Sequence, residues 1–151
     1  MGESHVYDKA KYHRGDAAQY GLGERHAAHH IAYFVRWLLE RGLFSPERIA
    51  GGDVPRVDGR VDGTRLLDWF SREMDDCLLD EALSEEGDRF ARDYYEERYL
   101  VDYVGVLAAN LESAYHVAWS EENWQRIAVV LDRRHAEFLK PKRRWWPFGG
   151  R

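Results

Sequence analysis

Residues 24–41 read ERHAAHHIAYFVRWLLER, and this stretch decides the fold. Its apolar side chains recur every three to four positions, which is the pattern of one buried face of a helix. That face comprises Ala27, Ile31, Phe34, Val35 and Leu38, and it is widened by Tyr33, Trp37 and Leu39. Gly42 follows at a position that suits a left-handed cap. The stretch therefore predicts a well-buried helix.

Further helices are predicted downstream of this one. Ser45 and Pro46 start a short helix that the glycines at 51 and 52 stop, and longer helices are expected over 64–74, 84–108 and 120–139. For the helix that Ser84 opens, the 3.6-residue period predicts an inward stripe. Its members are Phe90, Tyr94, Val101, Val104 and Ala108.

The remaining segments show little periodicity in their apolar residues. The first 23 residues, interrupted by glycines, predict an irregular N-terminal arm, and loop 51–63 has room for a short hairpin through Val57 and Val61. We therefore expect a mainly α, compact single domain over residues 1–140, with four to five helices and at most a minor β element.

Composition excludes several classes of protein. The 151 residues are 44% hydrophobic and 32% charged, which is too apolar for a disordered chain. No run approaches the ~18 apolar residues of a membrane span, and the first residues do not resemble a secretory leader. The one cysteine, Cys77, suits a reducing compartment, so we expect a cytoplasmic protein.

The formal charge of −5 hides an uneven distribution. Residues 68–102 hold thirteen acidic side chains against four arginines, whereas residues 140–151 hold five basic side chains and no acid. The tail over 141–151 also carries Trp145, Trp146 and Phe148. Left in water, these rings would be an aggregation hazard, so we expect the tail to pack back on the body rather than bind a membrane or nucleic acid.

Several segments resemble a family of small, uncharacterised bacterial proteins. The resemblance rests on the opening from Tyr7-Asp8 to Tyr12-His13, on residues 30–43, on the run from Phe90 through Tyr94-Tyr95 and Tyr99 to Tyr103, and on Tyr115-His116-Val117 with Asp132-Arg133-Arg134. The family brings no assigned activity. Its small size and acidity are similar to those of immunity proteins, which bind and neutralise a cognate toxin.

Enzymatic alternatives have weaker signals. His26 and His30 lie four residues apart, the spacing that lets two imidazoles share a metal ion, but the glutamate of an HExxH motif is missing. Acidic neighbours disfavour the Cys77 thiolate, and no nucleophile elbow or phosphate-binding loop is present. We therefore expect no catalytic residue, bound metal or other cofactor. A metal-dependent enzyme using His26, His30 and a carboxylate is the alternative, and a structural or scaffold subunit is a third reading.

The acidic segment predicts the function that we favour, a binding protein without enzymatic activity. An acidic helix face speeds the encounter with a basic partner, and tyrosine is enriched in binding hot spots. We expect this face, like that of an immunity protein, to occlude a basic surface on a protein such as a toxin. The predicted contact residues are Asp75, Asp76, Asp93, Tyr95, Glu96, Tyr99 and Asp102. The sequence leaves the oligomeric state open.

Overall fold

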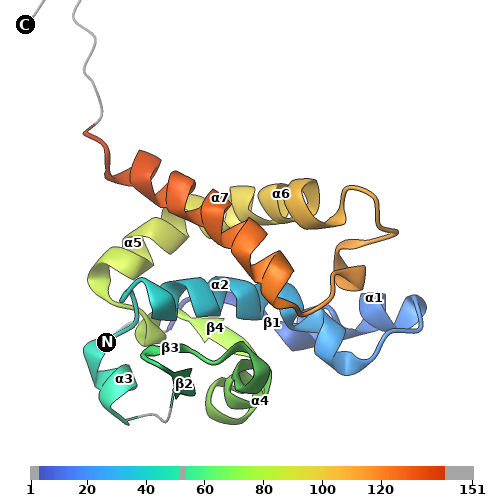
Figure 1. Cartoon of the computed structure of the whole chain (residues 1–151), viewed down its shortest axis with the longest axis horizontal. Coiled ribbons are helices and arrows are strands. Elements are labelled where there is room, and N and C mark those ends of the chain that lie inside the picture. Colours follow the sequence, from blue (N-terminus) through green and yellow to red (C-terminus); the bar gives the residue numbers. More distant parts are fainter. Residues whose placement is uncertain (1–3, 52–53, 142–151) are drawn as a thin grey trace, which may run out of the picture.

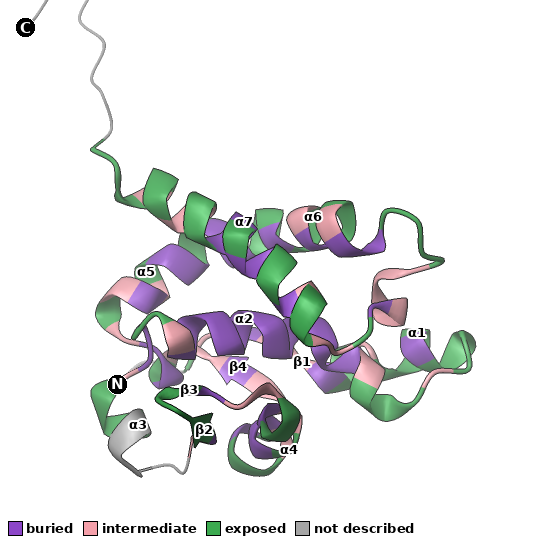
Figure 2. Cartoon of the chain, in the orientation of Figure 1, coloured by how far each residue is buried: buried purple, intermediate pink, exposed green. Residues whose placement is uncertain are grey.

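The helix predicted from the opening stretch lies at the centre of the molecule. The computed structural model describes residues 4–51 and 54–141. In it, α2 (His29–Glu40) is surrounded by the other elements, and every residue from His29 to Leu39 is buried (Figures 1 and 2). The preceding turn, Glu24–Ala27, is a 3-10 helix, so the α-helix starts five residues later than predicted.

The other helices cover α2 from several sides. Helix α4 packs against it on one side and α7 crosses it on another (Figure 1). The helices are α1 (Arg14–Gln19), α3 (Pro46–Gly51), α4 (Gly63–Met74), α5 (Glu85–Tyr94), α6 (Leu100–Tyr103) and α7 (Glu121–Leu139). The mainly α, compact fold is confirmed.

The predicted helix over 84–108 is one continuous helical run with two wide-turn interruptions. Helix α5 passes into a π-helix at Tyr95–Tyr99, and α6 passes into a second π-helix at Val104–Ala108. A π-turn holds one more residue than an α-turn and so rotates all later side chains. The inward stripe consequently continues through Tyr95, Tyr99 and Tyr103.

This rotation corrects the predicted stripe. Phe90, Tyr94 and Ala108 are buried as expected, but Val101 and Val104 point outward, with 71% and 38% of their surface exposed. A strict α-helical period cannot reveal the inserted residue.

The N-terminal arm is docked on the body through a small sheet. Strand β1 (Val6–Lys9) pairs antiparallel with β4 (Cys77–Leu79), and the register shifts between Val6 and Asp8. Neither strand was predicted, because three or four residues carry little periodic pattern. The expected hairpin is present as β2 (Arg56–Val57) and β3 (Arg60–Val61).

Side chains at three helix starts fix where these helices begin. Ser84 accepts a hydrogen bond from the Gly87 amide, Ser120 accepts one from the Asn123 amide, and Asp62 accepts one from the Thr64 amide. Each satisfies a backbone donor that the first turn leaves free. The serine caps agree with the sequence, and Asp62 caps α4.

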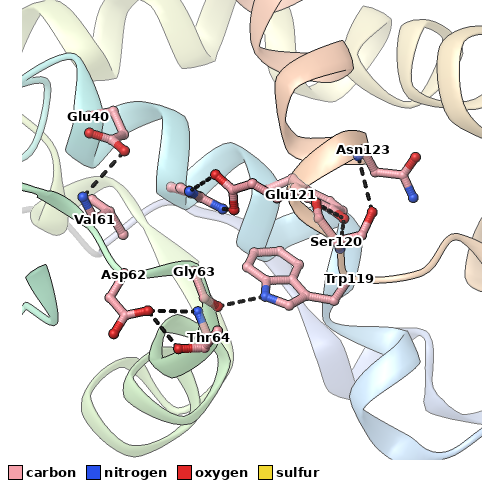
Figure 3. Close-up of polar contacts among 11 residues, drawn as sticks. Glu40, Val61, Asp62, Gly63, Thr64, Trp119, Ser120, Glu121 and Asn123 are labelled. Carbon is pink, nitrogen blue, oxygen red and sulfur yellow. Dashed lines mark hydrogen bonds and ion pairs between the residues drawn. The ribbon is translucent and has the colours of Figure 1, made fainter. Parts of the chain in front are cut away.

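The starts of α4 and α7 are tied to each other and to α2 (Figure 3). The Trp119 indole donates to the Gly63 carbonyl oxygen at 2.7 Å. Next to it, Glu121 accepts two hydrogen bonds from the buried Arg36 guanidinium of α2, at 2.8 and 3.1 Å. These contacts hold the segment before α7 against the core. The predicted packing of tail 141–151 concerns residues that, apart from Pro141, lie outside the described part of the chain.

Candidate functional site

The side chain of Asp8 lies at the centre of a cluster that joins distant parts of the chain. Its Oδ1 is 2.7 Å from His13 Nε2, and its Oδ2 is 3.1 Å from His30 Nε2. Two further groups donate hydrogen bonds to the carboxylate. The backbone amide of Lys9 donates to Oδ1 at 2.9 Å, and the Tyr95 hydroxyl donates to Oδ2 at 2.8 Å. Each oxygen therefore has two hydrogen-bond partners.

Local structure explains how these side chains meet. Asp8 follows the register shift of β1, and irregularities of this kind re-aim side chains. His13 ends the 3-10 turn Ala10–Tyr12, and His30 lies in the first turn of α2. The rings of His13 and His30 meet edge to face, with centroids 4.6 Å apart. We call Asp8, His13 and His30 the Asp8 cluster.

The surroundings set the charge of the cluster. Burial would raise the pKa of Asp8, but the hydrogen bonds of His13 and His30 outweigh it and hold this pKa well below its usual range. Burial lowers the pKa of His30 and raises that of Tyr95. At neutral pH the Asp8 carboxylate is thus ionised, the buried His30 imidazole is uncharged, and the Tyr95 phenol beside the cluster is protonated.

Tyrosine and histidine side chains around the cluster hold its framework. The Tyr115 hydroxyl is 2.9 Å from His13 Nδ1. Tyr99 donates to the backbone carbonyl of His30 at 2.5 Å. His26 and His29 approach the backbone carbonyls of Tyr115 and Val117. Thus His26, which the metal-dependent alternative paired with His30, instead contacts the backbone of Tyr115. His13 takes the place of the second imidazole beside His30.

The cluster borders a surface pocket of about 220 Å³. The pocket is lined by Tyr7, Asp8, His13, His30, Tyr95, Glu96 and Leu100. At its edge Glu96 pairs with His5 at 2.6 Å. A small molecule or water could therefore approach the Asp8 cluster from this side.

Two of the predicted contact residues need correction. Tyr95 and Tyr99 do not face outward: they are 6% and 1% exposed, because the π-turn rotates them toward Asp8 and His30. Their rings stack on each other with centroids 4.9 Å apart. They therefore build the interior of the site and cannot contact a partner in this conformation.

The predicted acidic contact residues lie in different environments. Asp102 is bound by Arg134 at 2.8 and 3.0 Å and by the Tyr94 hydroxyl at 2.6 Å. Asp93 pairs with Arg98, Asp76 with Arg14 and Glu96 with His5. Asp75 is exposed, and no cation pairs with it among residues 4–51 and 54–141. Arg14 and Arg134, which lie outside residues 68–102, thus neutralise two charges of the acidic segment, so its surface is less acidic than its sequence.

Asp8 and His13 were not among the predicted site residues, because they match no catalytic or metal-binding motif. Both lie in the Tyr7–His13 segment that carries the family resemblance, and that segment was the available signal. The other segments of the resemblance also reach the site: His30 comes from the second, Tyr95 and Tyr99 come from the third, and Tyr115 comes from the last.

Fold and site together define a small, mainly helical domain with a carboxylate–imidazole cluster beside a pocket. Residues 6–117 match the family described as "Domain of unknown function (DUF7832)", so the chain belongs to this family. A search of curated proteins and a search of solved structures each found no match. Across the described residues, no helix combines the length and the apolar character needed to cross a bilayer.

Proposed function

We propose that this chain is a protein-binding protein whose contact surface is the outer side of residues 93–104. One observation carries the proposal: Leu100, Val101 and Val104 are neighbours on one helical run and are 49%, 71% and 38% exposed. Single exposed apolar residues are common, but adjacent ones on one face are typical of interaction sites. We call these three residues the outer stripe.

Charge around the outer stripe favours a basic partner. Asp93, Glu96 and Glu97 are exposed within two turns of it, and within the described residues no cation pairs with Glu97. Apolar contact would supply most of the affinity, while the carboxylates would steer the encounter and fix its orientation. The proposed surface therefore uses exposed apolar residues of the same helical run in place of the buried Tyr95 and Tyr99. Acidic residues still surround these apolar contacts.

A basic enzyme cleft that must attract phosphate, such as that of a nuclease toxin, fits this surface. The proposed mechanism is that of immunity proteins, in which the bound protein occludes the cleft. The free thiol of Cys77 fits a reducing compartment, and we propose the cytoplasm as the place of action.

The test starts from the neighbouring gene. A product with a toxin domain supplies the partner, whereas a neighbourhood of metabolic genes alone would count against the proposal. With the partner in hand, Val101→Asp should weaken binding by about tenfold or more, equal to about 1.4 kcal/mol. Glu97→Lys should slow association, most strongly at low salt.

Val129→Asp is the matched control, because Val129 is also an exposed helical valine, at 67%, but lies on α7. Equal losses of affinity for Val101→Asp and Val129→Asp would contradict the proposed surface. Asp102 is unsuitable for this test, since Arg134 and Tyr94 bind its carboxylate and its replacement would disturb the fold.

A further inference from the structure

The three side chains of the Asp8 cluster bring potential metal ligands together. One ligand atom from each, a carboxylate oxygen of Asp8 and a ring nitrogen of His13 and His30, lie within 4.8 Å of one another. Tetrahedral ligands bound at 2.0–2.2 Å lie about 3.3–3.6 Å apart. Asp8 Oδ1 is 2.7 Å from His13 Nε2 and Asp8 Oδ2 is 3.1 Å from His30 Nε2, so small side-chain movements would bring the ligand atoms to that spacing.

We propose that Asp8, His13 and His30 bind one first-row transition-metal ion. Metal binding at this cluster does not rest on the proposed function, although Glu96 and Leu100 of the partner surface also line the pocket beside the cluster. Two imidazole nitrogens and one carboxylate oxygen suit Zn²⁺, Fe²⁺ or Co²⁺. Mg²⁺ and Ca²⁺ prefer sites made only of oxygen ligands. The ligand set differs from the His26/His30 pair suggested by the sequence, because His26 is held by the backbone of Tyr115.

Hydrogen bonds outside the three ligands suit a metal-bound form. A histidine that binds an ion through Nε2 carries its proton on Nδ1 and usually donates it to a neighbouring group. His13 has such a neighbour, the Tyr115 hydroxyl 2.9 Å from Nδ1. When an ion replaces the contacts between Asp8 and the imidazoles, the Tyr95 hydroxyl and the Lys9 amide still hold the carboxylate in place.

The position of the cluster favours a site with open coordination positions. The chain supplies three ligands, and the pocket of about 220 Å³ adjoins them. Structural zinc sites are usually closed by four protein ligands, whereas catalytic sites keep a position for water or substrate. Tyr7, Tyr95, Glu96 and Leu100 line the rest of the pocket. A bound ion would therefore be accessible to a small ligand.

The experiment uses the full chain without an affinity tag, stripped of metal by a chelator and titrated with Zn²⁺ by calorimetry. We expect one equivalent to bind with a dissociation constant in the micromolar range or tighter. Mg²⁺ and Ca²⁺ should show no comparable binding. Asp8→Asn and His13→Gln should weaken zinc binding by about 100-fold or more, and Tyr95→Phe, which removes only a supporting hydroxyl, by about tenfold.

His116→Gln is the matched control, because His116 contacts Ser113 and Glu112 away from the cluster and should leave zinc binding unchanged. If Asp8→Asn fails to fold, protection of His13 in the wild-type chain from diethylpyrocarbonate by Zn²⁺ provides the second measurement. Stoichiometric binding lost with the cluster, or zinc protection of His13, supports the proposal. Wild-type protein that binds no equivalent of zinc, or binding that survives both ligand substitutions, overturns it.

Discussion

The inner and outer sides of the helical run 85–108 differ in burial more than their residue types suggest. The inner side presents Tyr95, Tyr99 and Tyr103 to the core, whereas the outer side presents Leu100, Val101 and Val104 to solvent. Both sets are apolar enough to form a core. The π-turn at Tyr95–Tyr99 decides between them by rotating the tyrosines inward and the aliphatic residues outward.

This difference links local backbone geometry to function. Turned inward, Tyr95 reaches Asp8 and Tyr99 reaches the backbone of His30, so the inner side supports the Asp8 cluster. Turned outward, the aliphatic residues form the stripe proposed to meet a partner. π-turns inside α-helices are frequently found at functional sites, in keeping with this arrangement.

The largest effect on stability is expected for truncation of an inner residue of the run, compared with the same truncation of an outer residue. Tyr99→Ala should reduce the free energy of unfolding by about 3–5 kcal/mol, because it removes a buried ring and the hydrogen bond to His30. Val101→Ala should change it by less than about 0.5 kcal/mol, because this side chain is exposed. Urea denaturation measures both, and similar losses would show that the two sides are not as described.

A second comparison uses glycines on the same run. A Cβ atom at Gly87 would collide with the backbone carbonyl of Leu43, so Gly87→Ala should destabilise the fold by about 1–3 kcal/mol. A Cβ atom at Gly105 meets nothing within 4 Å, so Gly105→Ala should be neutral or stabilise by up to about 1 kcal/mol. Thermal unfolding separates the two, and a stable Gly87→Ala variant would contradict the close packing of α5 on Leu43.

The smallest effect concerns the ion pair that anchors the run to α7. Asp102→Asn should cost about 1–2 kcal/mol at pH 7, because Arg134 loses its bidentate partner. The hydrogen bonds of Arg134 lower the pKa of Asp102, so its stabilisation is present above the ordinary carboxyl pKa and is lost as pH falls through the lowered value. The wild-type advantage should therefore shrink in acid below about pH 4.

Asp93→Asn is the control for that prediction, since the Asp93–Arg98 pair is exposed on both sides and should contribute less than about 1 kcal/mol. Unfolding curves at pH 7 and pH 3 compare the two variants. A stability difference between wild type and Asp102→Asn that persists unchanged at pH 3 would contradict the ion-pair explanation.

Much of the helical fold follows from the sequence because its helices carry strong periodic signals. The apolar face of α2, the serine caps at 84 and 120, and the hairpin through Val57 and Val61 can all be predicted from the sequence. The pairing of β1 with β4 is not, because it joins short segments about 70 residues apart, beyond any local pattern.

The site was harder to predict for the same physical reason. His30 was selected for its spacing from His26, but its partner Asp8 lies on β1, whose docking is a long-range event. The π-turn changes helical phase without a clear residue signature, so Tyr95 and Tyr99 were expected on the surface. The motif around Asp8 and His13 carried the only local hint, through resemblance rather than through chemistry.

The central claim is that Asp8, His13 and His30 bind one metal ion through the two Nε2 atoms. Long-range ¹H–¹⁵N NMR spectra of the histidine side chains test this most directly, because they distinguish free, protonated and metal-bound ring nitrogens for all seven histidines at once. On addition of one equivalent of Zn²⁺, the Nε2 signals of His13 and His30 should move to metal-bound positions, with Nδ1 protonated, while the other five stay unchanged. Unchanged signals for His13 and His30, or a shift confined to other histidines, would contradict the account.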